Sequence, residues 1–162
     1  MKRPSPFPRP PREPFLPLLR ELVRCYQAFE RHSSRHIRSL GLTPSQFDII
    51  ATLGNTEGLS CKELGERTLI TKGTLTGVID RLEARGLLRR HDTAHDRRSF
   101  TVMLTPAGER EFARIFPAHL QFLRPAFGGL SGADYERLER GLAALREQFE
   151  QAETLASGGS RA

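Results

Sequence analysis

The stretch from Thr71 to Gly86 has the sequence pattern of a short α-helix with one apolar face and one bare face. Its apolar residues recur at i, i+3, i+4 and i+7, which places them on one side of a helix: Leu75, Val78, Ile79 and Leu82. The opposite side carries glycines, short hydroxyl side chains and cations: Lys72, Gly73, Thr74, Thr76, Gly77 and Arg81. Thr71 is a suitable N-cap and Gly86 a suitable C-terminal stop. The pattern predicts a helix that buries one face and brings the other close to a second surface.

A shorter helix is predicted immediately before it. Ser60 is a suitable N-cap, and Glu63, at the third position after it, completes a capping box. Residues 68–70 then join the two helices with the short connection typical of a helix-turn-helix. The two helices are therefore predicted to form a helix-turn-helix.

A β-hairpin is predicted to follow. Residues 87–91 and 99–104 flank a polar loop at 92–98. Within the second segment Phe100, Val102 and Leu104 alternate with Thr101 and Met103, which is the spacing of a half-buried strand. Residues 59–104 therefore predict a helix-turn-helix with a hairpin wing.

The charge of the chain favours a polyanionic partner. The 162 residues carry a net charge of +6 and a pI of about 10.1, and cations release counterions when they neutralise phosphates. Cations gather on the predicted second helix and wing: Arg81, Arg85, Arg89, Arg90, Arg97 and Arg98. The C-terminal segment is acidic, and such a separation is expected when only one face meets DNA.

Several classes of protein are disfavoured. There is no apolar run long enough to span a membrane, and the N-terminus is proline-rich rather than a signal peptide, so we expect a cytoplasmic protein without a membrane partner. Cys25 and Cys61 lie too far apart in sequence to indicate a disulfide framework or a zinc site. The His91-Asp92 and His95-Asp96 pairs lie in a predicted loop, which is a poor scaffold for four metal ligands. With no recognisable nucleophile or phosphate-binding loop, we expect no metal, no cofactor and no enzymatic activity.

Helices are predicted on both sides of the helix-turn-helix and wing. Residues 1–14 predict a flexible basic arm, either a solvated tail or a segment that touches DNA. A long helix is predicted over 15–41, and Thr43, Pro44 and Gln46 predict the start of the next. A further helix should begin near Pro106, bend at Pro117 and break at 125–130. A last helix with an apolar seam should start after Ser131 and end at 154, leaving 155–162 as a disordered tail.

Taken together, these segments resemble the MarR-type transcription regulators. The resemblance is carried by 42–47 (LTPSQF), 58–60 (GLS) with Glu63 and Leu64, 74–87 (TLTGVIDRLEARGL), 96–99 (DRRS) and 104–108 (LTPAG), in the order and spacing of that family. It implies a mainly α fold, with a winged helix-turn-helix at 42–105 and a helical dimerisation region at 15–41 and 106–154. It also implies a homodimer that binds double-stranded DNA at a pseudo-palindromic operator, expected to be a repressor. The residues expected in the dimer contact are Leu18, Leu22, Phe116, Leu120, Leu138, Leu142, Leu145 and Phe149.

The residues expected to contact DNA lie on the helix-turn-helix and wing: Ser60, Lys72, Gly73, Thr74, Thr76, Gly77, Arg81, Arg97 and Arg98. Arg81 is the strongest candidate for a base contact, and Lys72 near the helix start suits a phosphate. The resemblance implies that one of Arg97 and Arg98 enters the minor groove while the other pairs with an acid, in an order left open. The competing interpretations are an ordinary core helix and a solvated turn.

The resemblance also places an effector pocket where the dimerisation helices meet the winged part. Its expected residues are Arg24, Phe29, His32, Arg35, His36 and Phe47, whose basic groups suit an aromatic carboxylate or phenolate. Two alternatives stay open. One is a redox-sensing regulator that uses Cys25, and the other is a winged-helix module that binds protein without DNA specificity.

Overall fold

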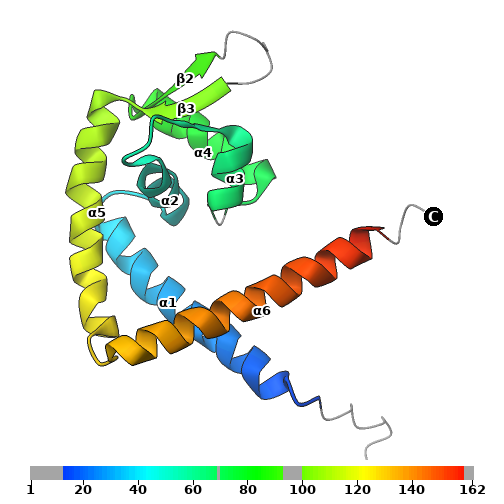
Figure 1. Cartoon of the computed structure of the whole chain (residues 1–162). Coiled ribbons are helices and arrows are strands. Elements are labelled where there is room, and N and C mark those ends of the chain that lie inside the picture. Colours follow the sequence, from blue (N-terminus) through cyan, green and yellow to red (C-terminus); the bar gives the residue numbers. More distant parts are fainter. Residues whose placement is uncertain (1–12, 69, 93–99, 159–162) are drawn as a thin grey trace, which may run out of the picture. The chain divides into compact units, whose positions relative to one another are not determined.

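The structure is a computed structural model that describes residues 13–68, 70–92 and 100–158, without the side chains of Lys72 and Asp92. The elements in chain order are α1 (Leu16–Ser39), α2 (Pro44–Leu53), β1 (Leu59–Ser60), α3 (Cys61–Arg67), α4 (Lys72–Ala84), β2 (Leu88–Asp92), β3 (Phe100–Leu104), α5 (Pro106–Phe127) and α6 (Gly132–Gly158) (Figure 1). Helices dominate and the sheet is small, so the predicted mainly α fold with a hairpin is confirmed.

The predicted helix ends are confirmed where side chains specify them. Thr43 accepts the backbone N–H of Gln46, whose side chain accepts the N–H of Thr43 in return. Ser60 and Glu63 form the same capping box at the start of α3. Gly86 follows α4 at φ +70°, a left-handed conformation that glycine adopts without steric cost. These local signals fix where the helix-turn-helix starts and stops.

The sheet has one strand more than the predicted hairpin. β2 and β3 pair antiparallel with Leu88 opposite Leu104, as expected for the wing. β1 pairs with the other edge of β3, with Leu59 opposite Val102, which gives the order β1-β3-β2. A two-residue strand shows no alternation of its own in the sequence, so the pattern could not reveal β1.

The core of the helix-turn-helix is built on the apolar face of α4. Leu75, Val78, Ile79 and Leu82 are all buried, which confirms the predicted stripe. They belong to one cluster with residues such as Leu53, Leu64 and Val102 from the surrounding elements, and α4 contacts both α2 and β2 (Figure 1). With its apolar face held in the core, α4 presents its bare face outward.

The chain divides into two compact units, residues 1–120 and 121–162. The first contains the helix-turn-helix, the sheet, α1 and most of α5, together with the whole core cluster. In the second, the Tyr135 hydroxyl donates to the Phe127 carbonyl at 2.8 Å, and Ser131 and Asp134 cap the start of α6. Large apolar side chains of α6 are exposed, including Leu138, Leu142 and Phe149.

Of the predicted ends of the two C-terminal helices, the first agrees with the structure and the second is wrong. α5 continues through Pro117 to Phe127, so its end falls within the break predicted at 125–130. α6 runs to Gly158, beyond the expected end at 154. Its last turns are supported by hydroxyls that donate to carbonyls one turn earlier, Thr154 to Glu150 at 2.9 Å and Ser157 to Glu153 at 2.8 Å. Residues 1–12 of the predicted arm at 1–14, and residues 159–162 of the predicted tail at 155–162, lie outside the described residues.

None of the helices in the described ranges is both long and apolar enough to cross a membrane.

Candidate nucleic-acid interface

The outward face of α4 carries the predicted DNA-contacting residues side by side. Gly73, Thr74, Thr76 and Arg81 are exposed, and Gly77 is half-buried. A methyl group built on Gly73 would meet no atom within 4 Å, so this glycine leaves open space at the surface of the helix. The face therefore has few bulky side chains and can come close to another molecule, and it carries the exposed cation Arg81 toward its C-terminal end.

Gly77 and Arg81 act as a pair. A methyl group built on Gly77 would lie 3.6 Å from Nη1 of Arg81, so the guanidinium lies over the glycine, one turn away on the same face. Arg81 forms no ion pair with any other described residue. An arginine with all its donors available can make the bidentate contact that favours guanine.

The N-terminus of α4 is polar and uncapped. Thr71 occupies the N-cap position but makes no side-chain cap bond, and its hydroxyl lies 3.1 Å from that of Thr74. Thr71 therefore marks the predicted helix start without capping it. The backbone N–H groups of this turn suit a phosphate, since the start of a helix carries partial positive charge. Lys72 begins α4, but its side chain is outside the description.

Ser60 is already engaged in its own helix. Its hydroxyl donates to Oε2 of Glu63 at 2.7 Å and accepts the N–H of Glu63 at 3.2 Å. The hydrogen bonds from the Ser60 hydroxyl and from its backbone N–H to the carboxylate hold the pKa of Glu63 below its usual value, because they stabilise the charged form. Any contact of Ser60 with DNA would come in addition to this capping role.

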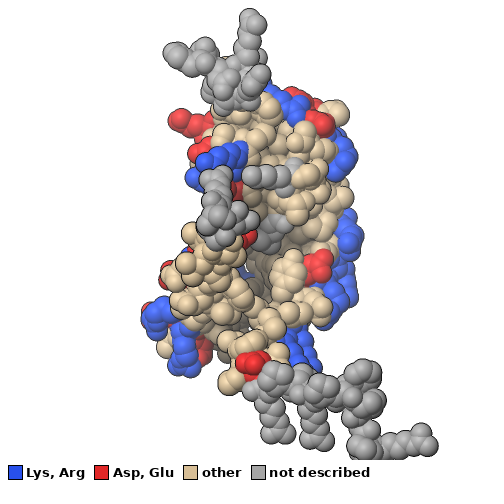
Figure 2. Space-filling model, turned by 90° about the vertical axis from the view of Figure 1, so that its right-hand side faces the viewer, with Lys and Arg blue, Asp and Glu red and all other residues tan. Residues whose placement is uncertain are grey.

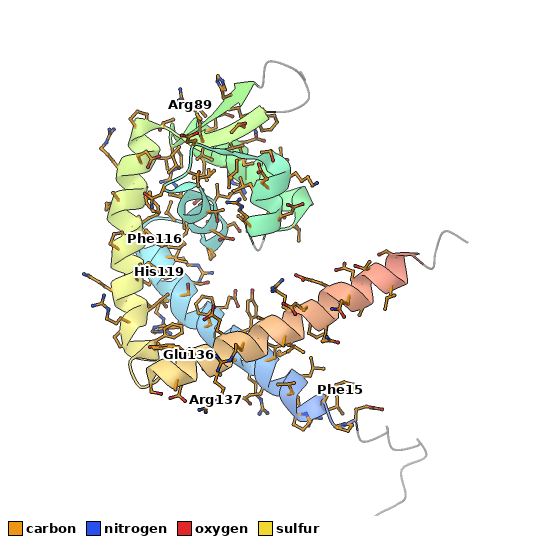
Figure 3. All side chains as sticks on the ribbon, viewed as in Figure 1. Phe15, Arg89, Phe116, His119, Glu136 and Arg137 are labelled. Atoms are coloured by element: carbon orange, nitrogen blue, oxygen red, sulfur yellow. The ribbon has the colours of Figure 1, made fainter. Side chains whose placement is uncertain are left out.

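Arg97 and Arg98 lie outside the described residues. The strands that carry their loop are described, and they pair up to Asp92 opposite Phe100. Arg89 lies on β2 with its side chain exposed (Figure 3).

Arg90 does not belong to the outward cationic surface where the sequence pattern placed it. Its guanidinium donates to the carboxylates of Asp80 and Glu83 on α4, and its backbone N–H donates to Oε1 of Glu83 at 3.3 Å. The guanidinium carbon also lies 5.1 Å from the ring centre of Phe100 on β3. The hydrogen bond to Asp80 is the main cause of a raised Arg90 pKa. The sequence did not predict this triad of Arg90, Asp80 and Glu83, although both acids lie in the helix that was predicted to contact DNA.

Both signs of charge occur on the surface shown in Figure 2. The net positive charge is therefore not spread evenly over this surface, and the exposure of each cation on α4 and the wing matters separately. Arg81 and Arg89 are exposed, whereas Arg90 is half-buried by its acids.

The structure brings together only part of the predicted effector site. His36 and Phe47 meet at His119, a buried residue of α5 that the predicted effector site did not include. Figure 3 labels His119 on this helix. Nδ1 of His119 lies 3.0 Å from Nδ1 of His36, and its Nε2 lies 3.1 Å from the hydroxyl of Ser33. The Phe47 ring packs edge-on with a centroid distance of 4.7 Å. Burial, followed by the charges of His36 and His32, lowers the pKa of His119.

The other predicted effector residues lie at the surface of α1. Phe29, His32 and Arg35 are exposed, and so is Arg24, whose guanidinium lies 4.0 Å from the carboxylate of Glu21. His32 nonetheless acts on His119, whose pKa its charge helps to lower.

The two cysteines differ in their surroundings. Cys25 is exposed on α1, and Cys61 is half-buried with its thiol pKa raised by burial. A raised pKa lowers the thiolate fraction on which oxidation depends. In the described ranges, no group of three or more His, Cys, Asp or Glu side chains could hold a metal ion.

Comparison with known proteins points to one family. Residues 40–99 match the family model described as the MarR family. The chain is 31% identical over 121 residues to YkoM of Bacillus subtilis, an uncharacterized HTH-type transcriptional regulator, covering 75% of this chain and 79% of that protein.

Solved structures agree. BpsR of Bordetella bronchiseptica, whose DNA binding is described as regulated by 6-hydroxynicotinic acid, is 30% identical with a TM-score of 0.71, covering 80% of this chain and 98% of its own. Sco3205 of Streptomyces coelicolor, a MarR-family regulator solved in complex with DNA, is 24% identical with a TM-score of 0.77. The match covers 89% of this chain and 92% of the Sco3205 chain. The winged helix-turn-helix fold is confirmed, and these relatives are regulators rather than enzymes.

Proposed function

Because this chain belongs to the MarR family of DNA-binding transcription regulators, we propose that it acts as a homodimeric repressor at a pseudo-palindromic operator. The observation that carries the proposal is the outward face of α4, where glycines and short hydroxyl side chains precede an exposed arginine with available donors. Two such helices would enter successive major grooves, with half-site centres about one helical turn apart. Such a dimer would act on DNA in the cytoplasm, by blocking access of polymerase.

The proposed contacts divide by chemistry. Arg81 contacts a base edge, with Gly73, Thr74, Thr76 and Gly77 allowing close approach. Lys72, Ser60 and the N–H groups at the start of α4 contact phosphates. Arg97 and Arg98 extend the surface into the minor groove.

The homodimer is supported by apolar side chains that one chain leaves uncovered. On α1, Leu18 and Tyr26 are 56% and 53% exposed, and on α6, Leu142 and Phe149 are each 56% exposed. Leu120 and Leu138 are exposed as well, and Leu22, Phe116 and Leu145 are half-buried. Large apolar side chains left exposed along a helix mark an interaction site, and a second copy of the chain is the partner that the family favours.

An anionic aromatic effector is proposed to release the operator. The relative BpsR is regulated by a hydroxylated aromatic acid. Here His36 and Phe47 lie next to the buried His119, and Arg24, Phe29, His32 and Arg35 have exposed side chains on α1. Cations and imidazoles of this kind suit a carboxylate. Binding would favour a dimer geometry that no longer fits the operator.

The test is selection of bound duplexes from a random pool by the purified chain, followed by titration at several salt concentrations. The proposal expects enrichment of a two-fold symmetric sequence and affinity that falls steeply with salt. Adding 6-hydroxynicotinate or another aromatic acid should weaken binding to that sequence. Absence of any enriched duplex would refute the DNA-binding role, and a salt-insensitive interaction would favour a protein-binding module.

A further inference from the structure

Arg90 ties the wing to α4 through two acids one helical turn apart. Asp80 and Glu83 lie on the same side of α4, and the guanidinium on β2 reaches both. Glu83 also accepts the backbone N–H of Arg90, so both the main chain and the side chain of the strand are held. Phe100 on β3 lies under the guanidinium. Arg90, on β2, therefore contacts both α4 and β3.

We propose that Arg90 is a positioning residue for DNA recognition, which fixes the β2–β3 wing at one distance and rotation relative to α4. This inference rests on the proposed function, because it assumes that α4 and the wing contact the same duplex. α4 and β2 are joined by the short connection at 85–87. Such a connection limits separation but does not by itself set the rotation of the ribbon. The triad of Arg90, Asp80 and Glu83 sets this rotation, so that α4 meets the major groove while the wing meets the minor groove.

The surroundings of the acids support a positioning role rather than a direct phosphate contact. Asp80 directly precedes Arg81, and its side chain is 56% exposed beside the proposed DNA face. A carboxylate beside the DNA face repels phosphates, so Asp80 would weaken DNA binding unless it also has a positioning role. The carboxylates of Asp80 and Glu83 instead engage both terminal nitrogens of Arg90, whose side chain is 29% exposed.

This argument gives opposite predictions for the removal of an acid. If the acids are only surface charges, Asp80→Asn and Glu83→Gln should tighten DNA binding, since each removes a negative charge near the duplex. If they position Arg90, each should weaken binding to the operator by about fivefold, the effect expected for a partly exposed ion-pair network. Arg90→Gln should weaken it by a similar factor.

The experiment is fluorescence anisotropy with the selected operator and a scrambled duplex, over a salt series. The variants are Asp80→Asn, Glu83→Gln, Arg90→Gln and Arg90→Lys, with Arg89→Gln as the matched control from the neighbouring exposed position on β2. The inference expects the first three variants to lose operator affinity and to keep the salt slope of the wild type. Arg90→Lys, which retains a charge but not the fork that reaches both acids, should fall between the wild type and Arg90→Gln.

Three results would overturn the inference. Acid variants that bind the operator as tightly as the wild type, or more tightly, would show that Arg90 does not act through them. A loss of about one unit of salt slope in Arg90→Gln would assign Arg90 to a phosphate instead. Equal losses on the operator and the scrambled duplex would indicate a general defect in folding, which the melting temperature of each variant would also show. A wild-type chain that binds no duplex would remove the proposed function itself.

Discussion

Replacing Gly108 with alanine should destabilise the fold at the junction between α4 and α5. Gly108 is buried in the first turn of α5. A methyl group there would lie 2.1 Å from the carbonyl oxygen of Leu87, whereas Cβ atoms in proteins stay at least 3.0 Å from such an atom. One of the two backbone segments would have to move by about 0.9 Å.

The cost follows from what holds this junction in place. The Leu87 carbonyl accepts the N–H of Thr105 at 3.0 Å, and the Thr105 hydroxyl donates to the Gly86 carbonyl at 2.6 Å and accepts the N–H of Gly108 at 3.1 Å. Movement of either segment would stretch these hydrogen bonds as well as relieve the clash. We expect Gly108→Ala to lower the free energy of unfolding by about 2 to 3 kcal/mol, the upper part of the range for overpacking.

Urea unfolding at a fixed protein concentration, followed by circular dichroism, measures the difference. The matched control is Gly73→Ala, also a glycine in the first turn of a helix, where a methyl group would meet nothing within 4 Å. That control should change the free energy of unfolding by less than about 1 kcal/mol. If Gly108→Ala proves as stable as Gly73→Ala, the steric reasoning is refuted.

Three further predictions concern binding, pH and assembly. Arg81→Ala should weaken operator binding by about 1 to 3 kcal/mol and relax preference at one base pair, as shown by titration against operators changed at single positions; an unaltered preference would exclude a base contact. Burial lowers the pKa of His119 in the folded state, so its contribution to the free energy of unfolding is complete above about pH 6.5. As the pH falls further, this contribution declines by at most about 1.4 kcal/mol per pH unit, until the pH reaches the folded-state pKa. Urea titrations should show a weaker pH dependence in His119→Gln than in the wild type, and equal slopes would assign the effect elsewhere. Leu142→Asp should convert the dimer to monomers in light scattering, whereas Glu139→Gln on the same helix should leave the dimer intact.

The parts of the fold that were predictable depend on near neighbours in sequence. The stripe of α4 and the capping boxes at Thr43 and Ser60 are set by residues within two turns of one another, and all three were confirmed. The third strand was missed because two residues carry no period. The end of α6 was placed too early, at 154, whereas the helix continues to Gly158.

The parts of the site that were not predictable depend on distant contacts. His119 and Ser33 are 86 positions apart, so helical spacing shows each on its own helix but not their meeting. Arg90 was grouped with the outward cations because charge in a sequence carries no direction. Its turn toward Asp80 and Glu83 depends on how β2 leaves α4, which is a property of the packed structure.

The most direct test is the mass of the purified chain in solution, measured by light scattering alone and with its selected operator at low ionic strength. A dimer at micromolar concentration that takes up one duplex per two chains is the predicted result. A monomer under these conditions, or a dimer that binds no duplex, would contradict the proposal of two α4 helices held at a fixed separation.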